Sequence, residues 1–357
     1  MRSTTVAMAA LPVNLPILSA AAAAIAAGVV LANFVVASCD LSLRFRRDPP
    51  KRHFEGKVVW IVGASQGLGR ALAVTWAARG ARLVLSSRNG ETLGRLKDQL
   101  VRDNATMRDG DVAIVPFDIT DTFDNVQRAA DAAFAAFGAG DDGRGGGIDY
   151  VVYNAGASQH ARVEDTRHDV AVKLVQMNLM GQMAVARAVL PHLLEQGHGH
   201  HVVVASMAAL VPSPGQAVYA AAKSAVRAYF LSMATELYAR GIRVSVVCPG
   251  PVDAGDDGSG SRMVYGCDGL MEQKNKKKSG ARVSLDVFTT LTLRAIYHEM
   301  DEVMISNHPV LLMGYLTRYL GGFAMWVLKK VGPGRVRQLE TGSGTGYDVG
   351  NMMRERR

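Results

Sequence analysis

Tyr219 and Lys223 are the two side chains in this sequence whose types and spacing best suit proton transfer. On a helix, positions i and i+4 share a face, so the lysine ammonium can approach the phenol. A free phenol has a pKa of about 10, and a cation about 4 Å away lowers it by up to ~3 units. We therefore expect this pair to exchange a proton with an alcohol or carbonyl oxygen. Taken alone, the same spacing also fits a solvated helix face.

A glycine-rich turn lies upstream of this pair. Residues 58–62 form an apolar run typical of a buried strand, and residues 63–69 follow with the spacing Gly-x-x-x-Gly-x-Gly. Glycine lets the backbone approach a pyrophosphate, and the N-terminus of the next helix favours its negative charge. We expect this turn to bind a dinucleotide through Gly63, Ser65, Gln66, Gly67, Leu68 and Gly69.

The residue after the second expected strand distinguishes the two nicotinamide dinucleotides. An acidic side chain about twenty residues past the turn would bind the ribose 2′-hydroxyl of NAD. This sequence has Ser87 and Arg88 there instead, and arginine can bind a 2′-phosphate through two hydrogen bonds. We predict NADP(H) as the cofactor; the alternative is that Arg88 is a solvated residue at a strand end.

Short apolar runs alternate with helical patterns, which predicts a single α/β domain with a doubly wound parallel sheet. The first helix is expected over residues 70–79. Two polar, glycine-rich stretches interrupt the alternation: 138–147, expected as a surface loop, and 254–280, expected as a substrate lid or a tolerated insertion. The expected strands are 58–62, 82–86, 112–117, 150–153, 202–205 and 244–247.

Taken together, these motifs resemble those of the short-chain dehydrogenase/reductase superfamily over residues 56–253. The motifs are the glycine turn, Asn154-Ala155-Gly156, Ser206, Tyr219-x-x-x-Lys223 and Pro249-Gly250. The resemblance implies a Rossmann-type fold and a carbonyl/alcohol oxidoreductase. Two departures are Val62, where family members usually have threonine, and Ala254, near the position of a threonine that often follows Pro-Gly.

The resemblance also implies a role for each matching residue. Ser206 would bind the substrate oxygen, and Tyr219 would transfer the proton. Lys223 would bind the nicotinamide ribose, and Asn178 would hold a water that connects Lys223 to solvent. Besides the glycine turn, the implied cofactor-binding residues are Arg88, Asp118, Asn154, Ala155, Gly156, Tyr219, Lys223, Pro249, Gly250 and Val252.

The sequences that flank the domain are similar to the membrane-bound member-seven group of the dehydrogenase/reductase SDR family. The similarity lies in residues 56–61 and in residues 305–316. That group resembles retinoid and steroid reductases of the endoplasmic reticulum, which implies a lipophilic substrate. A 3-ketosphinganine reductase is the alternative, and a non-catalytic NADP-binding membrane scaffold is a third possibility from a different class.

The N-terminal segment is expected to be a single-pass anchor in the endoplasmic reticulum membrane. Residues 3–39 carry no charge, and residues 16–39 would span about 36 Å as a helix, against a hydrocarbon core of ~30 Å. The basic cluster 44–52 places the catalytic domain in the cytosol. A cleaved signal peptide is the alternative, since Ala37, Ser38 and Cys39 form a small-residue run.

We therefore expect four regions: an anchor over 1–43, a basic linker over 44–55, a catalytic domain over 56–300 and an apolar tail over 301–357. The apolar stretch 310–328 contains Arg318, which makes a membrane span costly. We expect it to be either an interfacial segment that presses the substrate entrance against lipid or a last core helix.

Composition excludes other classes of function. The net charge of +8 comes largely from the clusters 44–52 and 274–278, which lack interleaved aromatic residues, so nucleic acid is not expected as a partner. Three cysteines make no disulfide framework, and His198, His200 and His201 are expected in a hydrated turn rather than a metal site. The expected partners are a lipophilic small molecule, membrane lipid and, in a homodimer, a second copy.

Overall fold

The computed structural model describes residues 15–138, 147–253, 262–273 and 282–341 of the 357-residue chain. The chain divides into two units, residues 1–37 and 38–357. The first unit contains helix α1 (Leu15–Val35), whose side chains are described from Ala23 onward. Among the described residues, no helix combines the length and hydrophobicity that crossing a bilayer requires. Most of the loop expected at 138–147, and the two ends of the stretch 254–280, lie outside the described residues.

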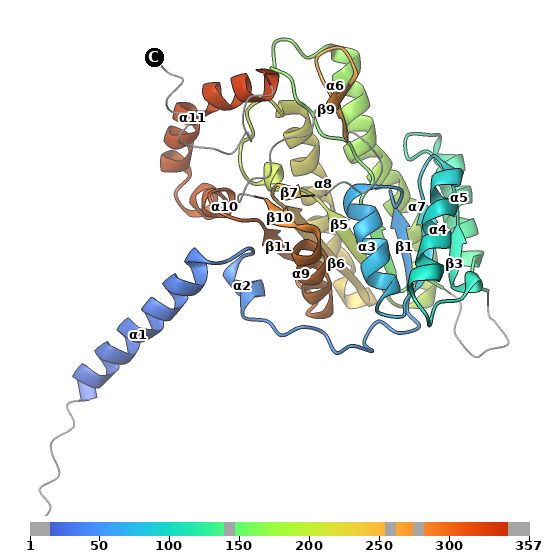
Figure 1. Cartoon of the computed structure of the whole chain (residues 1–357), viewed down its shortest axis with the longest axis horizontal. Coiled ribbons are helices and arrows are strands. Elements are labelled where there is room, and N and C mark those ends of the chain that lie inside the picture. Colours follow the sequence, from blue (N-terminus) through green and yellow to red (C-terminus); the bar gives the residue numbers. More distant parts are fainter. Residues whose placement is uncertain (1–14, 139–146, 254–261, 274–281, 342–357) are drawn as a thin grey trace, which may run out of the picture. The chain divides into compact units, whose positions relative to one another are not determined.

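The second unit is built on a seven-stranded sheet in the order β11-β6-β5-β4-β1-β2-β3, and every pairing is parallel (Figure 1). The predicted Rossmann-type sheet is therefore confirmed. The order reverses between β1 and β4, which creates the crevice where open α/β sheets bind ligands. The strands are β1 (Val58–Val62), β2 (Arg82–Ser86), β3 (Val112–Ile114), β4 (Tyr150–Tyr153), β5 (Gly199–Val204), β6 (Ile242–Pro249) and β11 (Glu302–Ile305).

Helices pack in two groups, which makes the sheet doubly wound (Figure 1). One group is α3 (Gly67–Ala77), α4 (Gly90–Asp103) and α9 (Leu285–Tyr297), and its core includes Trp76 and Phe288, both fully buried. The other group is α5 (Phe123–Ala135), α7 (Gly181–Gln196) and α8 (Ala217–Leu237), with α6 (His168–Val175) beside α8.

The catalytic unit extends beyond both boundaries expected from the sequence. Strand β11 lies after residue 300 and pairs with β6, so the tail contributes a strand to the sheet. On the other side, Asp40 accepts a hydrogen bond from the Met304 backbone N–H at 2.7 Å and caps the short helix α2 (Leu41–Arg44). The basic linker is therefore packed on the body at this end, where Arg294 also binds Asp48.

Strand β5 begins three residues earlier than expected, and this corrects the hydrated turn expected for its histidines. His200 and His201 are buried, whereas His198 is exposed. The core tolerates both imidazoles because each has a hydrogen-bond partner: His200 bonds the Ser245 hydroxyl at 2.9 Å and His201 bonds the Tyr153 hydroxyl at 2.7 Å. Among the described residues, no group of side chains is arranged to hold a metal ion.

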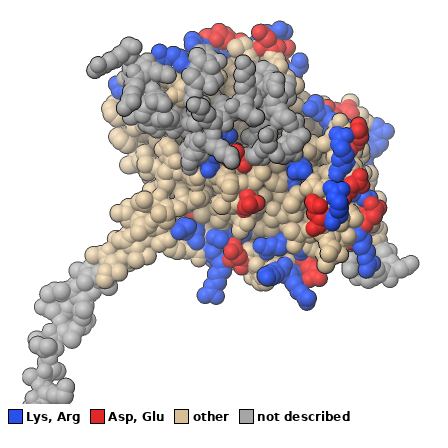
Figure 2. Space-filling view, in the orientation of Figure 1, with Lys and Arg blue, Asp and Glu red and all other residues tan. Residues whose placement is uncertain are grey.

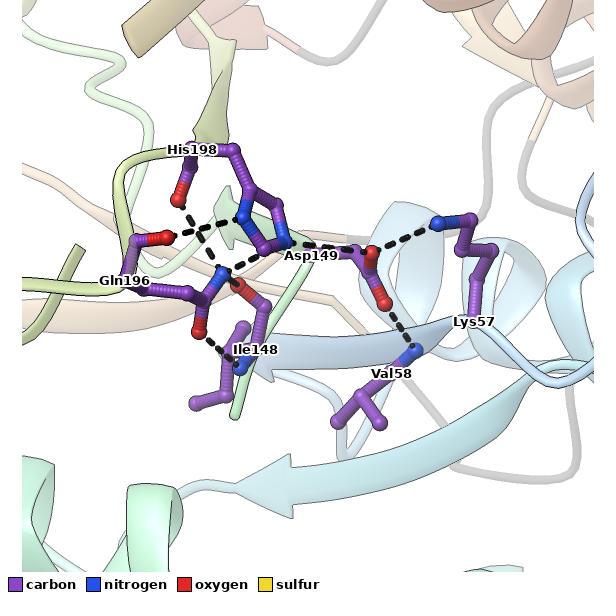
Figure 3. Close-up of polar contacts among 6 residues, drawn as sticks. All are labelled: Lys57, Val58, Ile148, Asp149, Gln196 and His198. Atoms are coloured by element: carbon purple, nitrogen blue, oxygen red, sulfur yellow. Dashed lines mark hydrogen bonds and ion pairs between the residues drawn. The ribbon is translucent and has the colours of Figure 1, made fainter. Parts of the chain in front are cut away.

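A polar cluster joins the amino ends of β1, β4 and β5, which are the strand ends opposite the crevice (Figure 3). The Asp149 carboxylate accepts hydrogen bonds from Lys57 Nζ at 2.8 Å and from the Val58 N–H at 2.9 Å. Gln196 pairs with both backbone groups of Ile148 through its side-chain amide. This cluster fixes the sheet without contacting the candidate site.

Candidate active site

A single cavity of about 730 Å³ opens along the carboxyl ends of the strands. Every residue predicted for catalysis or cofactor binding lines it, with the exception of Gly69. The sheet brings these residues together because each follows the end of a parallel strand or occupies the helix after it. The cofactor half of the cavity also includes Ser87, which the sequence analysis named only as the neighbour of Arg88, and Ile119, which it did not name.

The glycine turn has the close contacts that a pyrophosphate-binding loop needs. Gly63 has φ +91°, and a Cβ on it would lie 2.6 Å from the Ala155 nitrogen. Asn154 Nδ2 donates to the Gly63 carbonyl at 2.8 Å, and this bond ties the turn to the end of β4. A Cβ on Gly69 would lie 2.0 Å from that carbonyl oxygen. Gly69 therefore lets α3 pack on the turn behind the cavity wall, and the start of α3, which lines the cavity at Gly67 and Leu68, offers its N–H groups to an anion.

Arg88 stands at the end of β2, exposed and facing the same cavity. Within the described part of the chain, its guanidinium has no hydrogen bond or ion pair, so all five N–H donors remain available. Asp118, beyond β3, lines the cavity too, and its Oδ1 is held by the Thr120 N–H at 2.8 Å and the Thr120 hydroxyl at 2.7 Å. These residues fit a nicotinamide dinucleotide bound with its adenosine end over β2 and β3.

Tyr219 and Lys223 lie one turn apart on α8, as their spacing predicts. The Lys223 ammonium is 5.9 Å from the centroid of the Tyr219 ring and donates a hydrogen bond to the Val204 carbonyl at 2.9 Å. Burial lowers the pKa of Lys223 to about 8, because the charged form is separated from water. The cation is therefore held close to the phenol, where it favours the phenolate.

Asn178 lies in a π-helical turn, Gln176–Met180, between α6 and α7. Its Nδ2 donates to the carbonyls of Ala157 and Leu174, each at 3.0 Å, so the orientation of the amide is fixed. Its Oδ1 is buried and has no hydrogen-bond partner among the described residues. A Cβ built on Gly156 would be 2.5 Å from this oxygen and 3.6 Å from Lys223 Nζ. The space beside Gly156 is therefore shared by a buried acceptor and a buried donor, which suits a bridging water.

Ser206 follows the end of β5 and lines the cavity. Its Oγ accepts a hydrogen bond from the Ala208 N–H at 3.1 Å, which orients the hydroxyl at the start of a short 3₁₀ turn. Because the oxygen is the acceptor in this bond, the hydroxyl proton can still be donated to a ligand. The serine and the tyrosine thus reach one cavity from β5 and α8.

Two tail helices, α10 (Val310–Tyr319) and α11 (Gly321–Thr341), form much of the wall opposite the cofactor residues. The sequence analysis left the tail between an interfacial segment at the substrate entrance and a last core helix, and it did not expect the tail to line the cavity. Arg318, which argued against a membrane span, forms an ion pair with Glu302 of β11. The apolar lining side chains from this tail are Val310, Leu312, Met313, Leu316, Val327, Leu328, Val331 and Leu339.

The described middle of the expected lid is a hairpin of β8 (Arg262–Tyr265) and β9 (Leu270–Gln273). Val264 lines the cavity, and Tyr265 is buried in a small cluster with Val170 and Leu174 of α6. The Tyr265 N–H donates to the Ser158 carbonyl at 2.9 Å, and its carbonyl accepts from the His160 N–H at 2.7 Å. This part of the stretch is therefore a wall of the cavity. Ala254, one of the two departures from the family pattern, lies outside the described residues.

Known proteins resemble this chain over most of its length. The family profile described as short chain dehydrogenase matches residues 57–260. Human dehydrogenase/reductase SDR family member 7 is 32% identical over 320 residues, which are 88% of this chain and 90% of the human protein. Mouse dehydrogenase/reductase SDR family member 7B is 31% identical over 246 residues, 67% of this chain and 71% of the mouse protein.

Solved structures show the same fold. A short chain dehydrogenase from Bacillus anthracis is 27% identical and superposes with a TM-score of 0.51. The match covers 57% of this chain and 77% of the bacterial chain. An alcohol dehydrogenase from Thermococcus sibiricus, solved with 5-hydroxy-NADP, is 23% identical and has a TM-score of 0.57. The match covers 71% of this chain and 97% of the archaeal chain. The motifs, the sheet and these relatives agree, and the chain belongs to the short-chain dehydrogenase/reductase family, oxidoreductases that bind a nicotinamide cofactor and act on CH–OH groups.

Proposed function

We propose that this protein is an NADP(H)-dependent oxidoreductase that interconverts a carbonyl and an alcohol on a lipophilic, steroid- or retinoid-like substrate. The observation that carries the proposal is one cavity in which Ser206, Tyr219 and Lys223 face an apolar wall built by α10 and α11. Polar groups of the substrate would meet the three catalytic side chains. Its hydrocarbon body would be buried against the tail, at about 25 cal/mol for each Å² removed from water.

A bound nicotinamide supplies the hydride in reduction and accepts it in oxidation. The Ser206 hydroxyl donates a hydrogen bond to the substrate oxygen and stabilises the charge that develops on it. Tyr219 gives its phenolic proton to that oxygen, and the Lys223 ammonium stabilises the resulting phenolate. A water between Asn178 Oδ1 and Lys223 Nζ would return the proton from solvent. In oxidation, the same groups carry the proton in the opposite direction.

The choice of NADP(H) rests on Arg88. The guanidinium stands at the end of β2 with its donors available, where the adenosine ribose is expected to lie. Gly63, Ser65, Gln66, Gly67 and Leu68 would hold the pyrophosphate. Asp118, Asn154, Ala155 and Gly156 would line the adenine and ribose region, and Pro249, Gly250 and Val252 the nicotinamide end.

Substitution of Tyr219 tests the mechanism. Purified wild-type protein and Tyr219→Phe would be assayed with NADPH on a panel of steroids, retinal and 3-ketosphinganine. We expect loss of general acid catalysis to lower kcat by at least about 100-fold on every accepted carbonyl while the Kd for NADPH stays within a few-fold. Near-normal turnover by the variant would refute the mechanism. Preference for 3-ketosphinganine would assign the keto-lipid alternative, and NADPH binding without any turnover would favour the scaffold.

Membrane association belongs to the same proposal. We propose that residues 16–39 attach the protein to the endoplasmic reticulum membrane, with the catalytic unit on the cytosolic side next to the basic cluster 44–52. Asn104, in the sequon Asn104-Ala105-Thr106, tests the orientation. If the unit is cytosolic, this residue stays unmodified in cells. A mobility shift that both endoglycosidase and Asn104→Gln remove would place the unit in the lumen.

Exposed apolar residues of the tail support a second contact with lipid. The exposed fraction is 70% for Tyr319, 56% for Leu320, 54% for Phe323 and 59% for Trp326, and we call these four residues the tail patch. Figure 2 shows that charged side chains gather over α4 and α5, whereas the surface over α10 is mostly uncharged. The exposed pair Lys329 and Lys330 follows the patch, which suits an interfacial segment on an anionic membrane.

A further inference from the structure

Gln159 lies directly behind the wall of the active-site cavity, between Ser158 and His160, which line it. Its side chain is fully buried and nevertheless makes three hydrogen bonds. Its Oε1 accepts from the backbone N–H of Val218 at 3.0 Å and of Tyr219 at 3.2 Å. Its Nε2 donates to the Thr166 hydroxyl at 2.9 Å. One side-chain oxygen therefore holds two backbone donors, one of which belongs to the catalytic tyrosine itself.

These two N–H groups lie in the first turn of α8, where no carbonyl of the same helix is available as an acceptor. The residue at the N-cap position, Gln216, makes no side-chain capping bond there. Gln159 thus caps the helix from another segment, the loop that follows β4. Because the bond reaches the Tyr219 nitrogen, it constrains the backbone that carries the phenol.

Hydrogen bonds also fix the backbone on either side of Gln159 and the hydroxyl that its side chain contacts. The backbone of Ser158 and His160 is bonded to Tyr265 of the β8–β9 hairpin at 2.9 and 2.7 Å. The Thr166 hydroxyl, which accepts from Gln159, donates in turn to the Arg162 carbonyl at 2.6 Å. The amide plane of Gln159 is therefore fixed by contacts that do not involve α8, so it can act as a reference point for the helix.

We propose that Gln159 is a positioning residue for Tyr219. Its Oε1 sets the place of the first turn of α8 relative to the cavity, and so aligns the phenol with Ser206 and the substrate carbonyl. This inference rests on the proposed function for the role of Tyr219. A displacement of about 1 Å in a catalytic group can cost roughly 100-fold in rate, which makes such a cap important for turnover.

Three variants of the full-length protein test this role. Gln159→Leu removes the acceptor at similar size, and Gln159→Glu keeps an oxygen for the two N–H groups. Gln196→Leu is the control, because it deletes a glutamine that is partly buried and bonds the Ile148 backbone at the amino ends of the strands, away from the cavity (Figure 3). For each variant, kcat and KM would be measured with NADPH and an accepted carbonyl. Amide hydrogen exchange would be measured for the peptide that covers residues 217–223.

We expect Gln159→Leu to lower kcat by about 10- to 100-fold with little change in the Kd for NADPH, and to speed exchange at residues 217–223. Gln159→Glu should restore most of the kcat and the slow exchange, whereas Gln196→Leu should change thermal stability alone. Unchanged exchange and kcat in Gln159→Leu, or equal losses in all three variants, would overturn the positioning role. Exchange is measured without substrate, so it tests the cap even if wild-type protein reduces no carbonyl; that result would instead contradict the proposed function.

Discussion

Burial of the Lys223 ammonium opposes folding near neutral pH while it serves the active site. The pKa of Lys223 is lowered to about 8 in the folded protein, against 10.5 for the free side chain. At pH 7 the lysine is protonated in both states, so the folded state bears the full cost of removing the charge from water. Between pH 8 and 10.5 the folded state releases the proton first, and wild-type stability rises.

Lys223→Met should therefore abolish turnover and raise the free energy of unfolding at pH 7 by about 2 kcal/mol, offset in part by loss of the bond to the Val204 carbonyl. The gain should shrink as the pH rises from 8 towards 10.5. Denaturant unfolding at a series of pH values checks both statements. A variant that is less stable than wild type at pH 7, or a difference that does not change with pH, would contradict them.

Arg88 sets the expected cofactor preference. If Arg88 binds the 2′-phosphate as proposed, Arg88→Asp replaces attraction with repulsion, so the KM for NADPH should rise by roughly 10- to 100-fold and that for NADH should change little. Arg95→Asp makes the same charge change on α4 at a residue that pairs with Glu91 and does not line the cavity. Steady-state kinetics with both cofactors separate the two variants. If Arg88→Asp raised the KM for NADPH and for NADH equally, Arg88 would stabilise the fold and not select the cofactor.

At the scale of elements, strand β5 carries two neutral histidines in the core, and this makes the sheet sensitive to acid. Burial lowers the pKa of His200 and of His201 to about 3, against 6.5 in the unfolded chain. The unfolded state therefore binds protons first on acidification. The stability contributed by each neutral imidazole is complete above pH 6.5 and is lost as the pH falls towards 3.

His200→Gln removes one of these titrations and keeps a polar partner for Ser245. Between pH 7 and pH 5, wild-type protein should lose about 2 kcal/mol more unfolding free energy than this variant, since one pKa unit corresponds to about 1.4 kcal/mol. The exposed His168→Gln serves as control and should follow the wild type. If the unfolding free energy of wild type and of His200→Gln fell equally between pH 7 and pH 5, the histidines of β5 would not cause the loss of stability in acid.

At the scale of the whole molecule, the tail patch can be followed by fluorescence. The chain has three tryptophans; Trp60 and Trp76 are fully buried and Trp326 is 59% exposed. In vesicles of phosphatidylcholine and phosphatidylserine, brominated acyl chains should quench wild-type emission, and Trp326→Phe should lose most of this quenching. The proposed attachment through residues 16–39 is the same in both proteins, so the difference in quenching reports on the tail.

Phe323→Asp should also reduce the quenching, whereas Val172→Asp, a matched change on the exposed face of α6, should not. Equal quenching in wild type and Trp326→Phe would refute a lipid contact at the tail patch. A larger assembly in the absence of lipid, dissociated by Phe323→Asp, would assign the patch to a second copy of the chain instead.

The sequence by itself determined the sheet and nearly all of the predicted residues that line the cavity. Apolar runs bounded by turns reveal strands that are buried on both faces, and each predicted strand is present within a few residues of its expected bounds. The glycine turn and the i, i+4 spacing of Tyr219 and Lys223 are local patterns, so one stretch of sequence carries each of them. The family relation, which rests on these motifs, is confirmed by the match over residues 57–260.

Only the tertiary structure decided how the distant parts meet. Strand β11 was not predicted, because a four-residue run before a tail of similar hydrophobicity gives no local sign of its pairing with β6. The burial of His200 and His201 depends on hydrogen bonds to Ser245 and Tyr153, which lie more than forty residues away in the chain. The cap from Gln159 to Tyr219 spans 60 residues and the tail closes the cavity from beyond residue 309. Such contacts arise from chain topology and packing, and no periodicity within one segment encodes them.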